Sequence, residues 1–300
     1  MKILLFGPNG QVGWELQRSL SPLGRVISLD RQGMEGLAGN LTQPEGLAES
    51  IRATAPDVIV NAAAYTQVDQ AESEPDAARV VNARAPGVMA REAARFGAWL
   101  VHYSTDYVFH GKGATPWREE DRPEPVNVYG QTKLEGEEAV RRSGCRHLIF
   151  RTSWVYSHRG RNFLKSILRL ASERECLRVV DDQFGAPTAA ELIADVTAHA
   201  IRAVQTCASL AGTYHLAAAG ETSWWGYARL VIVEAEKSGC KLKTKAEDIE
   251  PVPSEQFPTP APRPRNSRLA TNRLEQALSL HVPPWEHGVI RCLHELCSKT

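Results

Sequence analysis

The sequence has no excess charge of either sign, because its 35 Lys and Arg residues balance its 35 Asp and Glu residues. A neutral chain exerts no long-range attraction on nucleic acid or on an anionic membrane surface. Long apolar runs are also absent: the N-terminal run stops at Gly7, too early for the core of a signal peptide, and no stretch approaches the length of a membrane span. We therefore expect a soluble, cytoplasmic protein that acts on a small molecule.

The chain also lacks a Cys-x-x-Cys pair, an internal repeat and a low-complexity tract. Scattered cysteines in a chain of this size fit reduced, packing side chains better than a disulfide or zinc framework. None is a candidate nucleophile. The cysteines are Cys145, Cys176, Cys207, Cys240, Cys292 and Cys297.

Short apolar runs alternate with longer mixed segments through about residue 153, as in a parallel sheet covered by helices. Beyond that point the pattern loosens, and it predicts a loop at Val155–Arg161 and a helix at Asn162–Arg174. Six prolines between Pro251 and Pro264 exclude a regular helix or a central strand and predict an extended segment. The predicted strands are Lys2–Phe6, Val26–Asp30, Val58–Ala62, Trp99–Ser104 and His147–Arg151.

A glycine-rich turn follows the first predicted strand, with Gly7, Gly10 and Gly13 in a Gly-x-x-Gly-x-x-Gly pattern. Glycine allows a tight turn and close approach to phosphates, and the N-terminus of the following helix attracts an anion. The second strand ends in Asp30 and Arg31, where an acid can bind an adenosine ribose and an arginine a 2′-phosphate. The pattern predicts a dinucleotide site, with Asp30 favouring NADH and Arg31 permitting NADPH.

These patterns predict an α/β fold with a Rossmann-type doubly wound parallel sheet. Residues 1–153 form the NAD(P)-binding domain, which a segment around 188–217 rejoins. The remainder of 154–300 forms a smaller, partly discontinuous C-terminal substrate domain. A chain of 300 residues is long enough for both.

Tyr129 and Lys133 lie four residues apart on a predicted helix, and so share one face. An ammonium near the phenol favours the ionised form, which turns a weak acid into a usable proton donor. Bringing the pKa of a phenol from about 10 to about 7 takes about 4 kcal/mol, of which one lysine supplies part. Thr105 closes the fourth predicted strand, where it can bond a substrate carbonyl or Tyr129.

Together these residues resemble the extended short-chain dehydrogenase/reductase superfamily, and within it the dTDP-4-dehydrorhamnose reductase family. The resemblance spans nearly the whole chain. It is carried by the blocks LLFGPNGQVGWELQ, VNAAAYTQVDQAESEP, HYSTDYVF, NVYGQTKLEGE, FRTSWVY, DQFGAPTAAELIAD and FPTPAPRPRNSRL. It implies reduction of the C4 keto group of dTDP-4-dehydro-6-deoxy-L-mannose by NADPH or NADH, the last step of dTDP-L-rhamnose synthesis.

The resemblance also implies roles for individual residues. Tyr129 is the proton donor, Lys133 holds the nicotinamide ribose and Thr105 tunes Tyr129. Ser104, Thr105 and Trp154 contact the sugar nucleotide, and Arg263 meets its diphosphate. The resemblance implies an adenine contact through Asn40 and Leu41, at a position where the family has an acid. The implied cofactor contacts are Gly10, Gln11, Val12, Asp30, Asn40, Leu41, Ala62, Ala63, Ala64, Tyr129 and Lys133.

The family carries a Mg²⁺ site at a homodimer interface, and its glutamates correspond to Glu15, Glu191 and Glu295. Nothing in their spacing reveals such a site, since helical glutamates usually face solvent. Hard carboxylate ligands suit Mg²⁺. We therefore expect a homodimer with a structural magnesium ion.

Two other functions stay open. A sugar-nucleotide epimerase or dehydratase of the same superfamily shares the glycine turn and the Tyr129 and Lys133 pair. The dehydratase needs a further acid and base, but here Asp106 is followed by Tyr107. A non-catalytic, reductase-like regulatory subunit is the other alternative.

Overall fold

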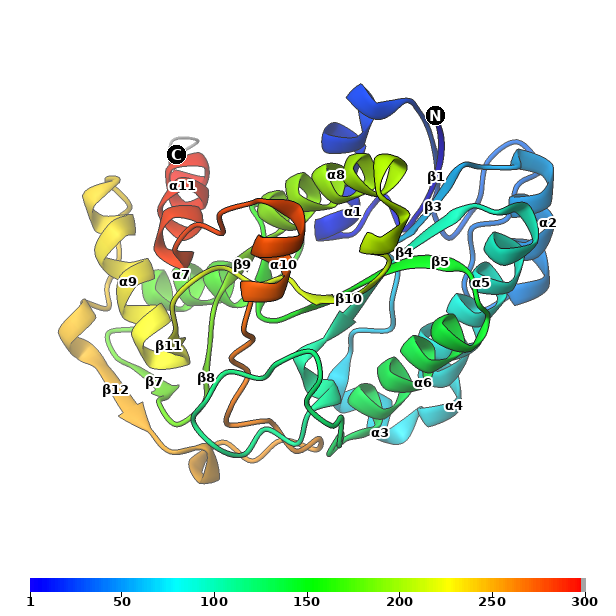
Figure 1. The fold of residues 1–300 in the computed structure, drawn as a ribbon. Coiled ribbons are helices and arrows are strands. Elements are labelled where there is room, and N and C mark those ends of the chain that lie inside the picture. The colour runs from blue at the N-terminus through cyan, green and yellow to red at the C-terminus, as the bar shows by residue number, and fades with distance from the viewer. Residues whose placement is uncertain (298–300) are drawn as a thin grey trace.

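The computed structural model describes residues 1–297 and contains a six-stranded sheet in the order β10-β5-β4-β3-β1-β2 (Figure 1). All five strand pairings are parallel. The strand order reverses at β1, and ligands bind beside such a switch point at the carboxyl ends of the strands. The prediction of a Rossmann-type parallel sheet is confirmed. The strands are β1 (Lys2–Phe6), β2 (Arg25–Leu29), β3 (Val58–Asn61), β4 (Trp99–Thr105), β5 (Arg146–Thr152) and β10 (Gly212–His215).

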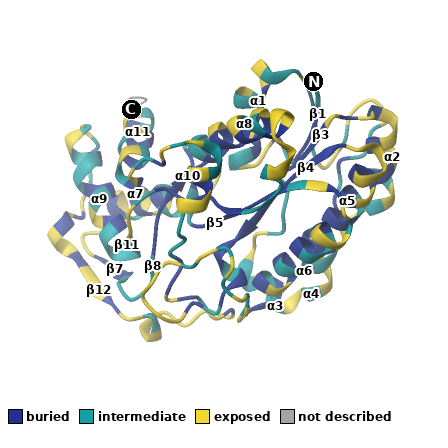
Figure 2. Ribbon diagram, in the orientation of Figure 1, coloured by how far each residue is buried: buried dark blue, intermediate teal, exposed yellow. Residues whose placement is uncertain are grey.

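Helices cover both faces of this sheet, because its inner strands point apolar side chains to both faces. On β1, Ile3 and Leu5 point to one face and Leu4 and Phe6 to the other. The first face packs against α1, α8 and α10, and the second against α2, α5 and α6. The inner strands are mostly buried and the outer helix faces are exposed (Figure 2). These helices are α1 (Gln11–Leu20), α2 (Pro44–Thr54), α5 (Ala85–Phe96), α6 (Val128–Arg142), α8 (Ala190–Thr206) and α10 (Asn272–Leu278).

Shorter helical segments connect these layers. A π-helical turn, η2, lies between α4 and α5 and places Asn82 inside the protein. Such turns are rare and frequently lie at functional sites. The short segments are α3 (Val68–Ser73), α4 (Pro75–Arg79), η2 (Val80–Arg84) and the 3₁₀ turns η1 (Ser21–Leu23), η3 (Asp106–Val108), η4 (Ala208–Leu210), η5 (Ala246–Asp248) and η6 (Ser254–Gln256).

A second lobe has its own apolar core, in which three helices pack with short strands (Figure 1). Asn162 caps α7 by accepting a hydrogen bond from the Lys165 amide, so that helix begins as predicted. Val155 and Tyr156 pair as a short strand within the predicted loop. The elements are α7 (Phe163–Glu173), α9 (Trp224–Lys237), α11 (Trp285–Cys297), β6 (Val155–Tyr156), β7 (Leu177–Val180), β8 (Phe184–Gly185), β9 (Thr188–Ala189), β11 (Thr222–Ser223) and β12 (Ile249–Val252).

The segment that follows β9 returns to the central sheet. Helix α8 packs on α1, and β10 then adds an edge strand beside β5. The exact division into two domains stays a prediction.

The proline-rich segment runs from β12 in the second lobe towards α3 (Figure 1). The Ala261 amide donates to the Asp69 carboxylate at 3.2 Å, and the Asn127 side chain donates to the Pro262 carbonyl at 2.8 Å. Pro251 does lie in a strand, β12, but that strand pairs only with β7 in a two-stranded sheet. An edge position is where a strand tolerates proline.

The prediction that all cysteines are reduced is wrong for one pair, because Cys240 and Cys297 form a disulfide. Cys240 follows α9 and Cys297 ends α11, so the bond joins two helices that pack together in the second lobe. The two residues are 57 positions apart, a separation that carries no local signal.

Among the residues that the structure describes, no helix has the length and apolar character needed to cross a membrane.

Candidate active site

The glycine turn between β1 and α1 needs glycine at two of its three positions. Gly7 has a φ of +81°, and a Cβ there would lie 2.8 Å from Ala63. A Cβ on Gly13 would lie 1.9 Å from the Gly7 carbonyl oxygen. Gly10 precedes α1, and no side chain caps the helix. The first amides of α1, at Gln11 and Val12, are therefore available to an anion, as a diphosphate site requires.

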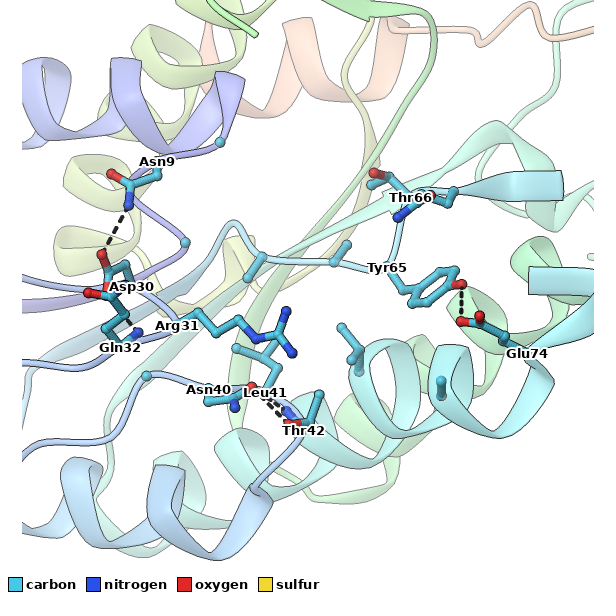
Figure 3. Close-up of a pocket in the computed structure, with 18 of the residues that line it drawn as sticks. Asn9, Asp30, Arg31, Gln32, Asn40, Leu41, Thr42, Tyr65, Thr66 and Glu74 are labelled. Carbon is cyan, nitrogen blue, oxygen red and sulfur yellow. Dashed lines mark hydrogen bonds between the residues drawn. The ribbon is translucent and has the colours of Figure 1, made fainter. Parts of the chain in front are cut away.

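A cavity of about 670 Å³ extends from this turn past the end of β2 (Figure 3). The Asp30 carboxylate accepts hydrogen bonds from the Asn9 side chain at 3.0 Å and the Gln32 amide at 2.8 Å. The Arg31 guanidinium reaches into the cavity beside Asn40 (Figure 3). The structure thus places an acid at the start of this cavity and a cation further in, an arrangement that suits a ribose and a 2′-phosphate.

The far side of this cavity contains Asn40, Leu41 and the segment that follows β3. Asn40 accepts hydrogen bonds from both the amide and the hydroxyl of Thr42, at 3.1 and 2.9 Å. Leu41 is buried. Asn40 therefore shapes the turn around the predicted adenine position.

The segment after β3 is held from both sides. The Asn61 side chain accepts from the Ala63 amide at 3.2 Å. Asn82, on the π-helical turn, accepts from the Tyr65 amide at 2.9 Å and donates to the Tyr65 carbonyl at 3.1 Å. Asn82 also donates to the Thr132 hydroxyl at 3.2 Å, which ties this wall to α6. The wall itself consists of Ala62, Ala63 and Ala64.

Tyr129 and Lys133 line a second cavity of about 470 Å³, which shares Gly7, Gly10 and Ala63 with the first. Tyr129 lies in the first turn of α6, whose N-terminus is capped by Asn127. The predicted proton donor therefore lies beside the predicted dinucleotide site.

The electrostatics of Tyr129 differ from the prediction. Burial raises the pKa of Tyr129 above its ordinary value, a hydrogen bond with Thr105 lowers it, and the charge of Asp106 raises it again. The Lys133 ammonium instead donates to the Tyr103 carbonyl at 2.5 Å. Lys133 is therefore not among the groups that set the pKa of Tyr129, contrary to the prediction. Burial lowers the pKa of Lys133 itself to about 8.

Ser104 lines the second cavity, but its hydroxyl points to Glu137, to which it donates at 2.5 Å. Glu137 is fully buried and accepts two hydrogen bonds from Arg151, at 2.9 and 2.7 Å. Arg141 adds a third cationic contact at 3.0 Å. These contacts hold the pKa of Glu137 below its ordinary value despite its burial. Ser104 therefore forms part of a buried charged network beneath the site.

The two remaining predicted substrate residues, Trp154 and Arg263, line neither of these two cavities. Trp154 stacks on Trp224 with ring centroids 3.6 Å apart, and its backbone has a φ of +49°. A positive φ is uncommon for a bulky residue and marks a constrained position. The Arg263 guanidinium forms an ion pair with Asp69 at 2.6 Å. It also lies close enough to Tyr107 to lower the pKa of that phenol, which burial raises to about 12.

The three glutamates predicted to bind metal do converge. Glu15 on α1 and Glu191 on α8 approach each other together with His158, and each residue offers a ligand atom within 4.8 Å of the others. Glu295 on α11 lies 3.8 Å from His158. Burial raises the pKa of Glu191 above its ordinary value, and the charges of Glu15 and Glu295 raise it further. The carboxylates thus repel one another.

Comparison with known proteins identifies the family of the chain. The family model described as the RmlD substrate binding domain matches residues 1–298. The dTDP-4-dehydrorhamnose reductase of Escherichia coli is 53% identical over 300 residues, which cover 100% of this chain and 99% of the relative. This chain belongs to the dTDP-4-dehydrorhamnose reductase family.

Solved structures agree with this assignment. A dTDP-4-dehydrorhamnose reductase from Bacillus anthracis, solved in complex with NADP, has a TM-score of 0.86 and 34% identity. The alignment covers 98% of this chain and 99% of that structure. A UDP-glucose 4-epimerase from Thermus thermophilus, in complex with NAD, has a TM-score of 0.77 at 18% identity and covers 99% of each chain. That second similarity concerns the fold alone.

Sequence reasoning missed four residues that shape this site. Their roles depend on partners from distant segments: Asn82 holds Tyr65, and Glu137 holds Arg151. No spacing rule connects such pairs, although Glu137 does lie one turn after Lys133 on the same helix face. The missed residues are Asn82, Glu137, Arg151 and His158.

Proposed function

We propose that the protein reduces the C4 keto group of dTDP-4-dehydro-6-deoxy-L-mannose to give dTDP-L-rhamnose, with NADPH or NADH as reductant. The observation that carries this proposal is the position of Tyr129, hydrogen-bonded to Thr105, in a cavity that opens into the glycine-turn cavity. The family supplies the substrate. The oxidoreductase class follows from both.

The chain's own residues account for binding and proton transfer. The free amides at the start of α1 bind the diphosphate of the cofactor, and Asp30 binds its adenosine ribose. When bound, the reduced nicotinamide supplies the hydride that reaches C4. The Tyr129 hydroxyl donates its proton to the resulting oxygen, and the Thr105 hydroxyl, which donates to Asp106 at 3.0 Å in the structure, can turn its proton to the phenolate that remains. Lys133, buried beside the same cavity, holds the nicotinamide ribose.

The hydrogen bond from Lys133 to the Tyr103 carbonyl leaves the ammonium two further donors. Tyr129 would be a better acid while oxidised nicotinamide is bound beside it, because the positive charge of that ring would favour the phenolate.

The same proposal includes a homodimer and a divalent cation held by Glu15, Glu191 and Glu295. The converging carboxylates support the cation, since hard oxygen ligands suit Mg²⁺. The imidazole of His158 beside them fits Mg²⁺ less well. The cation has no part in the proposed chemistry. The expected cytoplasmic location rests on the composition of the chain.

The proposal is tested with dTDP-4-dehydro-6-deoxy-L-mannose by following the loss of NADPH or NADH absorbance, with and without a chelator. Turnover that needs no added reductant, with NAD retained through purification, would favour an epimerase instead. Absence of turnover with both reductants would overturn the proposal.

Tyr129→Phe removes the proton donor, and we expect kcat to fall about 10²–10⁴-fold, the usual contribution of a general acid. Cofactor binding, measured by fluorescence titration, should stay close to wild type. Tyr107→Phe is the matched control, because that ring packs edge-on against Tyr129 at 5.5 Å and is assigned no proton. A Tyr129→Phe rate within severalfold of wild type would exclude Tyr129 as the acid.

A further inference from the structure

The cluster of Glu15, Glu191 and Glu295 contains a fourth side chain that the family resemblance did not indicate. One ring nitrogen of His158 lies within 4.8 Å of a carboxylate oxygen of Glu15 and of one of Glu191. His158 comes from the loop after β6, so four separate segments of the chain meet here. The site thus offers nitrogen as well as oxygen.

The His158 imidazole has no hydrogen-bonding role that would explain its position. Its Nδ1 is screened from solvent and has no hydrogen-bond partner among residues 1–297. The Glu295 carboxylate is 3.8 Å from that nitrogen, too far for a hydrogen bond. A buried polar atom without a partner costs about 1–3 kcal/mol, which a metal–nitrogen bond would offset.

The negative charges around the imidazole also favour a bound cation. Two arginines approach the cluster from its edge: Arg18 lies 3.3 Å from Glu15, and Arg291 lies 3.4 Å from Glu295. Both arginine side chains are mostly exposed, so their ion pairs are weak. Glu191 has no such partner among the ion pairs of the described residues. An ion bound between Glu15, Glu191 and His158 would balance the remaining charge.

We propose that this cluster is a mixed nitrogen and oxygen site that binds a first-row transition ion of the Zn²⁺ class in preference to Mg²⁺, with His158 as a ligand. Imidazole is a good ligand for Zn²⁺, whereas Mg²⁺ prefers oxygen ligands in near-octahedral geometry and gives up water reluctantly. The inference rests on the cation site proposed above and changes the ion that the site selects. Since Glu15, Glu191 and Glu295 lie on α1, α8 and α11, the ion would join the sheet to the second lobe.

The test measures Zn²⁺ and Mg²⁺ affinities of the full chain by calorimetry after chelator treatment. We expect His158→Ala to weaken Zn²⁺ binding by at least about tenfold, because even loss of a residue that only supports a ligand costs about 10–100-fold. Mg²⁺ binding should change less than about twofold, so the ratio of the two affinities falls. Glu191→Gln should weaken both ions.

His281→Ala is the matched control. The His281 ring nitrogen lies 3.9 Å from Glu275, much as His158 lies 3.8 Å from Glu295, but its side chain is 86% exposed and belongs to no cluster of metal-ligating side chains among residues 1–297. This variant should bind Zn²⁺ as the wild type does. An equal loss in both histidine variants would show adventitious binding and overturn the proposal.

X-ray absorption of the Zn²⁺-loaded protein gives a second readout that is independent of affinity. We expect imidazole scattering in the wild type and its loss in His158→Ala. A spectrum with oxygen ligands alone, or no Zn²⁺ binding, would overturn the inference. Reductase assays on the same preparations separate the two proposals. Reduction of the keto-sugar without an imidazole-bound ion would contradict this inference alone. Zn²⁺ binding through His158 without reductase activity would contradict the proposed function alone.

Discussion

At the scale of single residues, Asp106 controls the charge beside the proposed acid. It is buried, and it accepts a hydrogen bond from the Thr105 hydroxyl at 3.0 Å. Burial raises the pKa of Asp106 to about 6, while hydrogen bonds from Ser267 and Thr105 oppose that rise. Ionised Asp106 in turn raises the pKa of Tyr129. The carboxyl therefore couples the charge of the site to pH.

Asp106→Asn tests this coupling through stability. A carboxyl whose pKa is higher in the folded than in the unfolded state favours folding at low pH, and that contribution is lost as pH rises from about 4 to about 6. The shift from 3.8 to about 6 corresponds to about 3 kcal/mol. In urea denaturation, the free energy of unfolding of the variant should therefore rise by about 3 kcal/mol relative to that of the wild type between pH 3.5 and pH 7.5.

The matched control is Asp76→Asn, whose carboxylate is 93% exposed. Because that side chain lies in solvent, we expect no comparable gain in the free energy of unfolding between the two pH values. If Asp106→Asn behaved in the same way, the carboxyl would not titrate in this window.

Arg31 addresses cofactor choice. Its guanidinium reaches into the adenosine part of the cavity (Figure 3), where a 2′-phosphate would lie. We expect Arg31→Ala to raise KM for NADPH about tenfold or more, since hydrogen bonds to charged groups contribute about 1.5–3 kcal/mol. KM for NADH should stay nearly unchanged. Initial rates with each cofactor decide this, and an equal effect on both would remove Arg31 from the 2′-phosphate.

At the scale of elements, a buried ion pair joins α6 to β5. Glu137 and Arg151 are at most 3% exposed in their side chains and share two hydrogen bonds. Removing one partner leaves a buried charge, which typically costs 3–5 kcal/mol, whereas replacing both partners by apolar side chains often costs little. The pair therefore fixes the position of α6, the helix that carries Tyr129 and Lys133.

A double-mutant cycle tests this link. We expect Arg151→Met to lower the free energy of unfolding by about 3–5 kcal/mol, and the double variant with Glu137→Leu to be more stable than Arg151→Met alone. The exposed pair Arg142 and Glu138 on the same helix is the control, with an expected coupling of at most about 1 kcal/mol. Additive losses at Glu137 and Arg151 would show that they do not act as a pair.

At the scale of the whole molecule, the sequence predicts what depends on neighbours along the chain. The strands follow from apolar runs, and the glycine turn from its spacing, because both are local patterns. The Cys240 to Cys297 disulfide and the contact between Lys133 and Tyr103 are set by packing between distant segments. The family resemblance did bring Glu15, Glu191 and Glu295 together, since a relative's site carries tertiary information that spacing lacks. It could not indicate His158, which belongs to no pattern in the chain.

The proline-rich segment bonds to the sheet lobe at Asp69 and Asn127, and the ion pair of Arg263 with Asp69 belongs to this contact. Two roles are possible for that contact: Asp69 either holds Arg263 ready for the substrate diphosphate, or it merely fastens the segment. The roles differ in one respect. Removal of Asp69 leaves the Arg263 guanidinium in place, whereas substitution of Arg263 removes it.

We expect Arg263→Met to raise KM for the sugar nucleotide at least about tenfold, since charged hydrogen bonds contribute about 1.5–3 kcal/mol, with kcat and the KM for NADPH little changed. Asp69→Asn should have a smaller effect, because the guanidinium remains available to the diphosphate. Arg265→Met is the control, as that side chain is 58% exposed and pairs with Asp182 and Glu255. If initial rates showed equal losses for Arg263→Met and Asp69→Asn, the pair would only fasten the segment and Arg263 would not bind the diphosphate.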